Sequence, residues 1–139
     1  PVMQKLGASV TPLPTAEVYS ALEKGVIDFV LRTVSEAGPN PCPPIVVGVG
    51  IGGTFDKAAF LAKEALLRPL DDRHPERSYT RLEEHLLEEI NRLGIGPQGL
   101  GGTITCLGVK VSAHPTHIAG LPVAVNIGCD AHRHSTLVF

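Results

Sequence analysis

The segment Pro39-Asn-Pro-Cys-Pro-Pro44 constrains the fold of this chain more than any other feature of its sequence. Each proline fixes its own φ, lacks a backbone N–H, and pushes the preceding residue towards an extended conformation. These six residues therefore separate two regular elements. Before them, apolar residues recur at steps of three and four between positions 18 and 34, which predicts an amphipathic helix from Thr15 to Gly38. After them, the β-branched run 45–49 predicts a buried strand.

The rest of the chain alternates helical and strand patterns. Gly25 lies inside the first helix, where glycine costs about 1 kcal/mol relative to alanine, which allows a break there. Thr54 is a good N-cap for a second helix, and Thr80 with Glu83 has the capping-box pattern of a third. The acidic run 83–89 predicts a solvated helix face. In order, we expect a turn at 50–53, helices at 54–68 and 80–93, a glycine-rich loop at 94–102, and strands at 103–113 and 121–127.

This alternation predicts an α/β fold, a layered mixed sheet with flanking helices, in a single domain over residues 1–139 with residues 1–14 irregular. Hydrophobic residues make up 43% of the chain, which is enough for a core. The net charge is −2 with scattered lysines and arginines, so no nucleic-acid partner is indicated. No apolar run approaches the roughly 18 residues of a membrane span, and no signal peptide is recognisable. We therefore expect a cytoplasmic protein, and the start at Pro1 fits a fragment of a longer one.

The segment Gly48-Val-Gly-Ile-Gly-Gly53 has the pattern G-x-G-x-x-G between a predicted strand and a predicted helix. Asp71 and Asp72 lie about twenty residues further on, as in dinucleotide-binding folds. The acidic pair, however, follows a helix, whereas the ribose ligand of such folds ends a second strand. Two other interpretations stay open, namely a tight structural turn and a loop whose backbone N–H groups face an anion.

The three cysteines do not indicate a disulfide framework, because the chain shows no sign of secretion. Cys42 lies on a proline-stiffened loop, a preorganised setting that favours a metal ligand, with a packed thiol as the alternative. Cys129 ends the last predicted strand and opens a polar cluster that reaches His134. Zinc held by these two cysteines and a histidine is chemically feasible, but the spacing is not that of a zinc finger. Cys106 alternates with apolar neighbours in a predicted strand, which predicts an inert core thiol.

Three segments together resemble one family: residues 37–54 with the Pro-Cys-Pro-Pro motif, the glycine-rich residues 93–102, and His-Ile-Ala-Gly-Leu-Pro-Val-Ala-Val-Asn at 117–126. They are similar to the α part of class I fumarate hydratases and L-tartrate dehydratases, in the family's order. The resemblance implies that this chain is a fragment of a larger iron–sulfur hydro-lyase α domain, namely its C-terminal portion. It also implies two partners, the missing N-terminal half of the α part and a β subunit or β domain.

The resemblance further implies a cofactor and site residues. Members of the family hold a [4Fe–4S] cluster through three cysteines, two of which match Cys42 and Cys129. The third belongs to a Cys-Gln-Asp-Thr-Gly motif that is not found in this chain, so we expect it from a missing upstream segment. His117 matches a substrate-binding histidine, and His132 and Arg133 are candidates for the surroundings of the cluster. No catalytic residue is assigned, because the general base is expected outside this chain.

The implied reaction is the reversible hydration of a C4 dicarboxylate, fumarate plus water to malate, with an iron of the cluster as Lewis acid. L-tartrate dehydratase is the alternative, since discrimination between small diacids depends on pocket contacts. A fragment with half a site is expected to be inactive alone and to belong to a homo- or hetero-oligomer. A Rossmann-type oxidoreductase does not need a proline-locked cysteine. A non-catalytic interaction module without a cluster is the remaining alternative.

Overall fold

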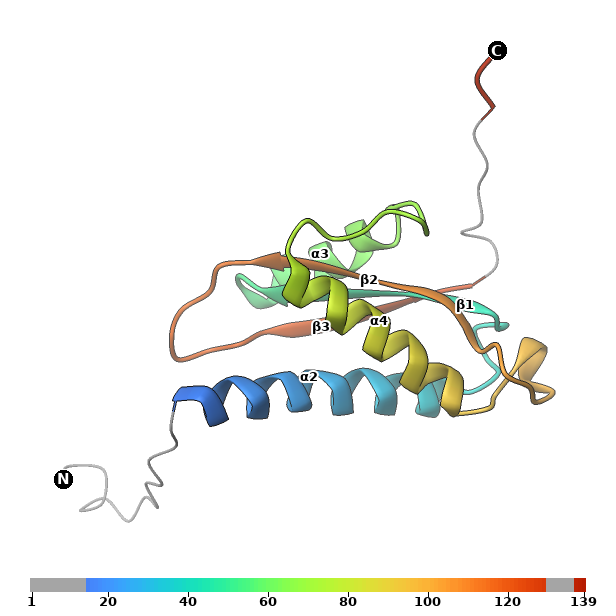
Figure 1. The fold of residues 1–139 in the computed structure, drawn as a ribbon, viewed down its shortest axis with the longest axis horizontal. Helices are drawn as coiled ribbons and strands as arrows, with labels where there is room; N and C mark the ends of the chain where they lie inside the picture. Colours follow the sequence, from blue (N-terminus) through green and yellow to red (C-terminus); the bar gives the residue numbers. More distant parts are fainter. Residues whose placement is uncertain (1–14, 130–136) are drawn as a thin grey trace.

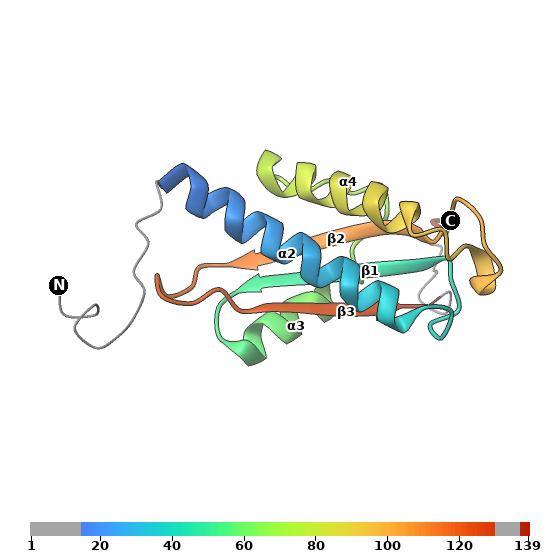
Figure 2. The same cartoon turned by 90° about the horizontal axis from the view of Figure 1, so that it is seen from below.

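The computed structural model describes residues 15–129 and 137–139, which form three layers (Figures 1 and 2). Helices α2 and α4 cover one face of a central sheet, and α3 covers the other face. In chain order the described elements are α2 (Thr15–Ala37), β1 (Ile45–Gly52), α3 (Phe55–Ala65), α4 (Arg77–Arg92), the 3₁₀ turn η1 (Pro97–Gly99), β2 (Cys106–His114) and β3 (Val123–Gly128). This arrangement confirms the predicted α/β class, a layered mixed sheet with flanking helices.

Strand β1 is the centre of the described sheet, whose order is β2-β1-β3. It pairs in parallel with β2 and antiparallel with β3, and all eight of its residues are buried. The turn predicted from position 50 starts later than expected. Gly52 still pairs with His114 on one side, and its N–H donates to the carbonyl of Pro122 at 2.8 Å on the other. The strand therefore continues as long as both neighbours supply partners for its backbone.

Helix α2 runs without a break through Gly25. Val26, Val30 and Val34 recur every four residues and are buried in the core against the sheet. Burial of one such side chain stabilises the fold by about 1.5–3 kcal/mol, which exceeds the cost of about 1 kcal/mol for a glycine in a helix. Packing therefore overrides the weak helix propensity of Gly25.

Helix α3 lies close to β1 because two residues of the strand have no side chain. A Cβ atom on Gly48 would lie 2.1 Å from the carbonyl oxygen of Ala62, and one on Gly50 would lie 2.0 Å from that of Ala58. The glycines at 52–53 have positive φ and form the turn into the helix. The glycine pattern thus serves packing and chain reversal, which supports the structural interpretation of this motif.

Helix α4 begins at Arg77, three residues before its predicted start. The N-cap residue is Glu76, whose side chain makes no capping hydrogen bond. Thr80 Oγ1 donates to the carbonyl of His74 at 2.9 Å, so this threonine ties the preceding loop to the helix instead of starting the helix. The prediction of a capping box formed by Thr80 and Glu83 is therefore wrong.

Glu83 is buried, and the prediction that the whole acidic run 83–89 faces solvent is wrong at this residue. Its Oε1 accepts hydrogen bonds from Val111 N at 2.8 Å and from Arg68 Nη1 at 3.0 Å. Strand β2 lies at an edge of the described sheet, so no described strand lies on its outer side to accept the N–H of Val111. A buried carboxylate is tolerated here because both a backbone donor and a cation satisfy it.

The other element boundaries differ from prediction for local reasons. Helix α3 ends at Ala65 rather than at 68, because the backbone N–H groups of 67 and 68 bond only three residues back, in a tight turn. Strand β2 starts at Cys106 rather than at 103, because the side chain of Asn91 takes the backbone N–H groups at its entrance. Strand β3 starts at Val123, directly after Pro122, which has no N–H for a strand ladder.

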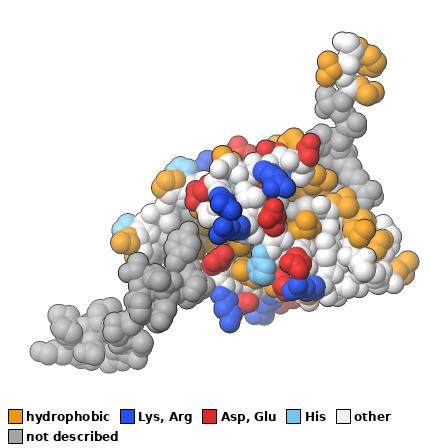
Figure 3. Space-filling model, in the orientation of Figure 1, with side chains coloured by type: hydrophobic (Ala, Val, Ile, Leu, Met, Phe, Trp, Pro, Cys, Tyr) orange, Lys and Arg blue, Asp and Glu red, His pale blue; other side chains and the backbone are white. Residues whose placement is uncertain are grey.

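Within residues 15–129 and 137–139, every helix is too short or too polar to cross a bilayer. Side chains of both charges are mixed over the face that α4 contributes, whereas apolar side chains gather near the loop after α4, at the right of the view (Figure 3). Leu100 in that loop is exposed. This end of the molecule also carries the cysteines.

Candidate functional site at one end of the sheet

The two candidate cysteine ligands lie at the same end of the sheet. Cys42 precedes the first residue of β1 by three positions, and Cys129 follows directly after the last residue of β3. The antiparallel register pairs Val46 with Gly128, so the start of β1 and the end of β3 are side by side (Figures 1 and 2). Both cysteines are free thiols. Residues far apart in the sequence are thus brought together as a shared ligand site requires.

The backbone of Cys42 is strained. Its φ is 54°, a left-handed conformation that costs a residue other than glycine about 1–3 kcal/mol. The turn is held by a hydrogen bond from Cys42 N to the carbonyl of Pro39 at 3.0 Å. The thiol is exposed, with Sγ 3.8 Å from the carbonyl oxygen of Asn40. A thiol packed as a small hydrophobe would need neither the strain nor the exposure, so both favour a ligand role.

The glycine-rich loop after α4 braces the cysteine loop. Gln98 N donates to the carbonyl of Pro43 at 2.8 Å, next to Cys42. A Cβ atom on Gly99 would lie only 2.3 Å from Cβ of Pro39, so the two loops are in direct contact. The segments 37–54 and 93–102, which the sequence presented as separate motifs, therefore form one structural unit that fixes the position of the thiol.

Asn91 holds the start of β2 at this end of the sheet, a role that the sequence analysis missed. Its Oδ1 accepts hydrogen bonds from Thr105 N at 2.8 Å and Cys106 N at 2.9 Å. Its Nδ2 donates to the carbonyl of Cys106 at 3.2 Å. The signal that could have identified it is a single amide side chain in the last turn of a helix, where the other polar residues, Glu89 and Arg92, carry charge.

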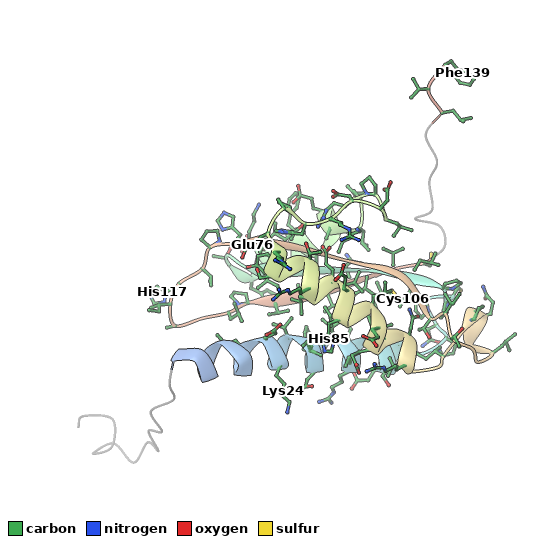
Figure 4. All side chains as sticks on the ribbon, viewed as in Figure 1. Lys24, Glu76, His85, Cys106, His117 and Phe139 are labelled. Carbon is green, nitrogen blue, oxygen red and sulfur yellow. The ribbon has the colours of Figure 1, made fainter. Side chains whose placement is uncertain are left out.

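Cys106 lies at the same end of the sheet, at the start of β2 (Figure 4), but it is enclosed. Its residue is 2% exposed, and Sγ donates to the carbonyl of Gly108 at 3.2 Å. Burial raises the pKa of the thiol to about 12, so it stays protonated at neutral pH. Metal ligands are thiolates, which this environment disfavours. The prediction of a core thiol is confirmed.

His117 lies away from the cysteines, in the loop between β2 and β3 (Figure 4). It is exposed, and its Nδ1 accepts a hydrogen bond from Ala119 N at 3.1 Å. The six residues of β3 separate this loop from Cys129, a distance of about 20 Å at about 3.3 Å per residue. Within this chain the structure does not bring His117 to the cysteines. His132 and Arg133 lie outside the described residues.

The donor set at this end is incomplete for a metal centre. Among residues 15–129 and 137–139, no group of three or more His, Cys, Asp or Glu side chains is arranged to hold a metal ion. Two sulfur donors suit iron–sulfur clusters or zinc, since thiolates are soft ligands. Cys42 and Cys129 thus offer two donors of the kind that such centres use, and the described residues supply no third donor beside them.

Comparison with known proteins places the chain in a family. The sequence profile described as fumarate hydratase (Fumerase) matches residues 10–138. A protein of Methanocaldococcus jannaschii, provisionally named L(+)-tartrate dehydratase subunit alpha, is 53% identical over 112 residues, which are 81% of this chain and 39% of that protein. The L(+)-tartrate dehydratase subunit alpha of Escherichia coli K12 is 45% identical over 115 residues, 83% of this chain and 38% of that subunit.

The chain therefore belongs to the fumarate hydratase family, and the resemblance seen in the sequence is confirmed. It spans about two fifths of the length of the curated relatives that it matches.

Proposed function

We propose that this chain is the C-terminal portion of the α part of an iron–sulfur-dependent hydro-lyase acting on a C4 dicarboxylate. Membership of the fumarate hydratase family supports this chemistry. The structural observation that carries the proposal is the exposed, strained thiol of Cys42 at the same sheet end as the thiol of Cys129. Hydration of fumarate to malate is the first candidate reaction. Dehydration of L-tartrate is the second, favoured by the names of the relatives.

In this proposal Cys42 and Cys129 hold two positions of a [4Fe–4S] cluster, and the third cysteine comes from the part of the α polypeptide that this chain does not span. The bound cluster would supply an iron that acts as a Lewis acid towards a substrate oxygen. The contribution of this chain is to position two thiolates. The hydrogen bond from Gln98 to the proline segment limits the movement of Cys42, so little conformational entropy is lost when a ligand binds.

We also propose roles for three cationic or polar residues. His132 and Arg133 follow Cys129 by three and four positions in the sequence. Positive groups there would offset the negative charge of thiolates and of a dicarboxylate. His117 is proposed to bind a substrate carboxylate. Because it lies at the opposite end of β3 from Cys129, that role requires a rearranged loop or a site completed by another copy of the chain.

We also propose a partner subunit or domain, and the cytoplasm as the location of the protein. The relatives are named as α subunits, which supports a β subunit or β domain as partner in a homo- or hetero-oligomer. Cys42, Cys106 and Cys129 are all free thiols, as is usual in the reducing cytoplasm.

The test is anaerobic iron and sulfide analysis of the intact α polypeptide with its β partner, together with assays on fumarate and on L-tartrate. We expect about four irons per α polypeptide and turnover of at least one substrate. Cys42→Ser and Cys129→Ser should each abolish cluster assembly. Cys106→Ser is the matched control, because it removes the same functional group at the same end of the sheet from an enclosed position, and it should retain the iron.

Each outcome has a defined meaning. A full cluster in Cys129→Ser would contradict the ligand assignment. Iron without turnover of either diacid would leave the cluster site and remove the proposed substrate class. A wild-type complex that holds no iron would overturn the proposal and favour an interaction module without a cluster.

A further inference from the structure

The two edges of the described sheet are treated differently. At the β2 edge, side chains take over the hydrogen bonds that a neighbouring strand would make. Glu83 Oε1 accepts from Val111 N at 2.8 Å, and Arg68 Nη1 donates to the carbonyl of Val111 at 2.8 Å. Asn91 does the same for the backbone of Cys106. This edge is therefore closed to a further strand, by a device that proteins use against unwanted pairing.

Among the described residues, no side chain covers the β3 edge in this way. Gly52 N donates to the carbonyl of Pro122, which identifies this pair as one of the hydrogen-bonded pairs of the antiparallel ladder. Such pairs alternate along the strands, so Ala124 and Asn126 direct their backbone groups towards β1. Residues 123, 125 and 127 then direct theirs outwards. In the part of the chain that the structure describes, β3 pairs with β1 alone.

An apolar groove adjoins this open edge. It is lined by Leu22, Val26 and Phe29 of α2, together with Leu121 in the preceding loop and Val123, the first residue of β3. Leu22 is 46% exposed, Phe29 45% and Leu121 37%, which is a large exposure for apolar side chains that line one groove. Clusters of this kind beside a free strand edge mark a docking surface, because one segment can pair with the backbone and cover the side chains together.

We propose that the open β3 edge and its groove receive a β-strand from the part of the α polypeptide that the relatives have and this chain does not span. The inference rests on the proposed function, in which that part exists as a partner. Two observations select this occupant. The match covers only 38–39% of the relatives, so most of their polypeptide lies elsewhere. Leu22, the groove residue nearest the start of α2, lies seven residues from Thr15, about 10 Å along the helix, so polypeptide upstream of α2 has only a short path to the groove.

Hydrogen exchange with single-residue resolution tests the proposal by comparing the 139-residue chain with the intact α polypeptide. In the 139-residue chain, the amides of 124 and 126 should exchange slowly and those of 123, 125 and 127 rapidly, because only the first two are paired with β1. In the intact α polypeptide all five should exchange slowly. Rapid exchange at 123, 125 and 127 in the intact polypeptide would overturn the proposal.

A pair of variants of the intact α polypeptide separates docking from general stability. Phe29→Glu places a charge in the groove without altering β3, and it should raise the exchange rates at 123, 125 and 127 by at least about tenfold. Phe60→Glu is the control, since this exposed phenylalanine lies on α3, on the other face of the sheet, and it should leave those rates unchanged. Equal effects of the two variants would contradict a docked strand.

Two further outcomes remain decisive. If the 139-residue chain is a dimer whose 123, 125 and 127 amides are already slow, a second copy occupies the edge and the proposed occupant is wrong. Iron content and turnover of the intact complex are measured on the same samples. Slow exchange without iron would support the docked strand and contradict the proposed function. Iron and turnover together with rapid exchange at 123, 125 and 127 would support the proposed function and contradict the docked strand.

Discussion

Removal of the Glu83 carboxylate should cause a loss of stability far larger than expected for an acidic residue on a helix. The side chain is 7% exposed and accepts hydrogen bonds from Val111 N at 2.8 Å and Arg68 Nη1 at 3.0 Å. Glu83→Ala leaves a buried N–H without an acceptor, which costs about 1–3 kcal/mol. It also leaves the Arg68 guanidinium, 19% exposed, without its most buried anion.

The two contributions overlap and are not added, because both count polar groups that the lost carboxylate leaves unpaired. Breaking a buried ion pair by removing one partner costs about 3–5 kcal/mol. Arg68 keeps the carboxylate of Asp72 at 2.8 Å and the carbonyl of Val111, so the lower end of that range applies. Its Nη2 is buried without a hydrogen-bond partner among the described residues, which also reduces the net value of the pair. We therefore expect Glu83→Ala to lower the free energy of unfolding by about 3 kcal/mol, against a total of about 5–15 kcal/mol for a domain.

Urea unfolding followed by circular dichroism measures this loss. Glu83→Gln keeps an acceptor for Val111 N and removes only the charge, so it should cost about 1–2 kcal/mol. Glu84→Ala is the control at the neighbouring position. Its carboxylate side chain is 62% exposed and lies 3.7 Å from Arg73, a contact worth at most about 0.5 kcal/mol. Equal losses for Glu83→Ala and Glu84→Ala would refute the role assigned to the buried carboxylate.

Two further predictions test the packing of the sheet and the buried thiol. Gly50→Ala should cost more than about 2 kcal/mol in thermal unfolding, because its Cβ would lie 2.0 Å from the carbonyl of Ala58, whereas Gly25→Ala, with open space around it, should stabilise by up to about 1 kcal/mol. A loss in both variants would contradict the packing argument. Above about pH 9 the unfolded chain ionises Cys106 while the folded chain, with its pKa raised to about 12, does not, so stability should fall by at most about 1.4 kcal/mol per pH unit. Cys106→Ala should lack this share of the slope in urea titrations at about pH 8 and about pH 10.5, and an unchanged slope would show that the thiol is not responsible.

The parts of the fold that the sequence predicted are those in which burial follows local periodicity. The steps of four between Val26, Val30 and Val34 specify the buried side of α2 without reference to the rest of the chain. The β-branched start of β1 likewise identifies a strand that is covered on both faces. Gly25 changes neither pattern, because the core contacts of its neighbours outweigh its low propensity.

The start of α4 was predicted incorrectly because a long-range partner decides it. The spacing of Thr80 and Glu83 is compatible with a capping box, and nothing nearby in the sequence argues against one. The structure gives Glu83 a better partner in Val111, 28 residues further along the chain. Whether the N–H of Val111 lacks a strand partner depends on the order of the strands in the sheet. It therefore becomes visible only when the strands have been placed.

In the candidate site, one feature depends on strand pairing that the sequence does not reveal, and another could have been predicted from the sequence. Resemblance identified Cys42 and Cys129, but their meeting at one end depends on the antiparallel pairing of β1 and β3, which the sequence does not state. The separation of His117 from Cys129, by contrast, could have been predicted from the sequence. A strand was predicted between His117 and Cys129, and an extended strand of six residues keeps its two ends about 20 Å apart whatever its neighbours are.

The alternation along β3 also explains why its open edge could not be found in the sequence. Residues 123, 125 and 127 are apolar and pack against the core beside α2, whereas Ala124 and Asn126 face the side that α3 covers. Both faces of the strand are therefore partly covered, and its side chains carry no polar row that would mark a solvated surface. What remains open is the outer edge of the strand, where backbone groups point away from β1 in the plane of the sheet. The pattern of side chains does not reveal whether that edge has a partner. Backbone exchange is the measurement that detects it, because the outward N–H groups belong to residues whose side chains are already packed.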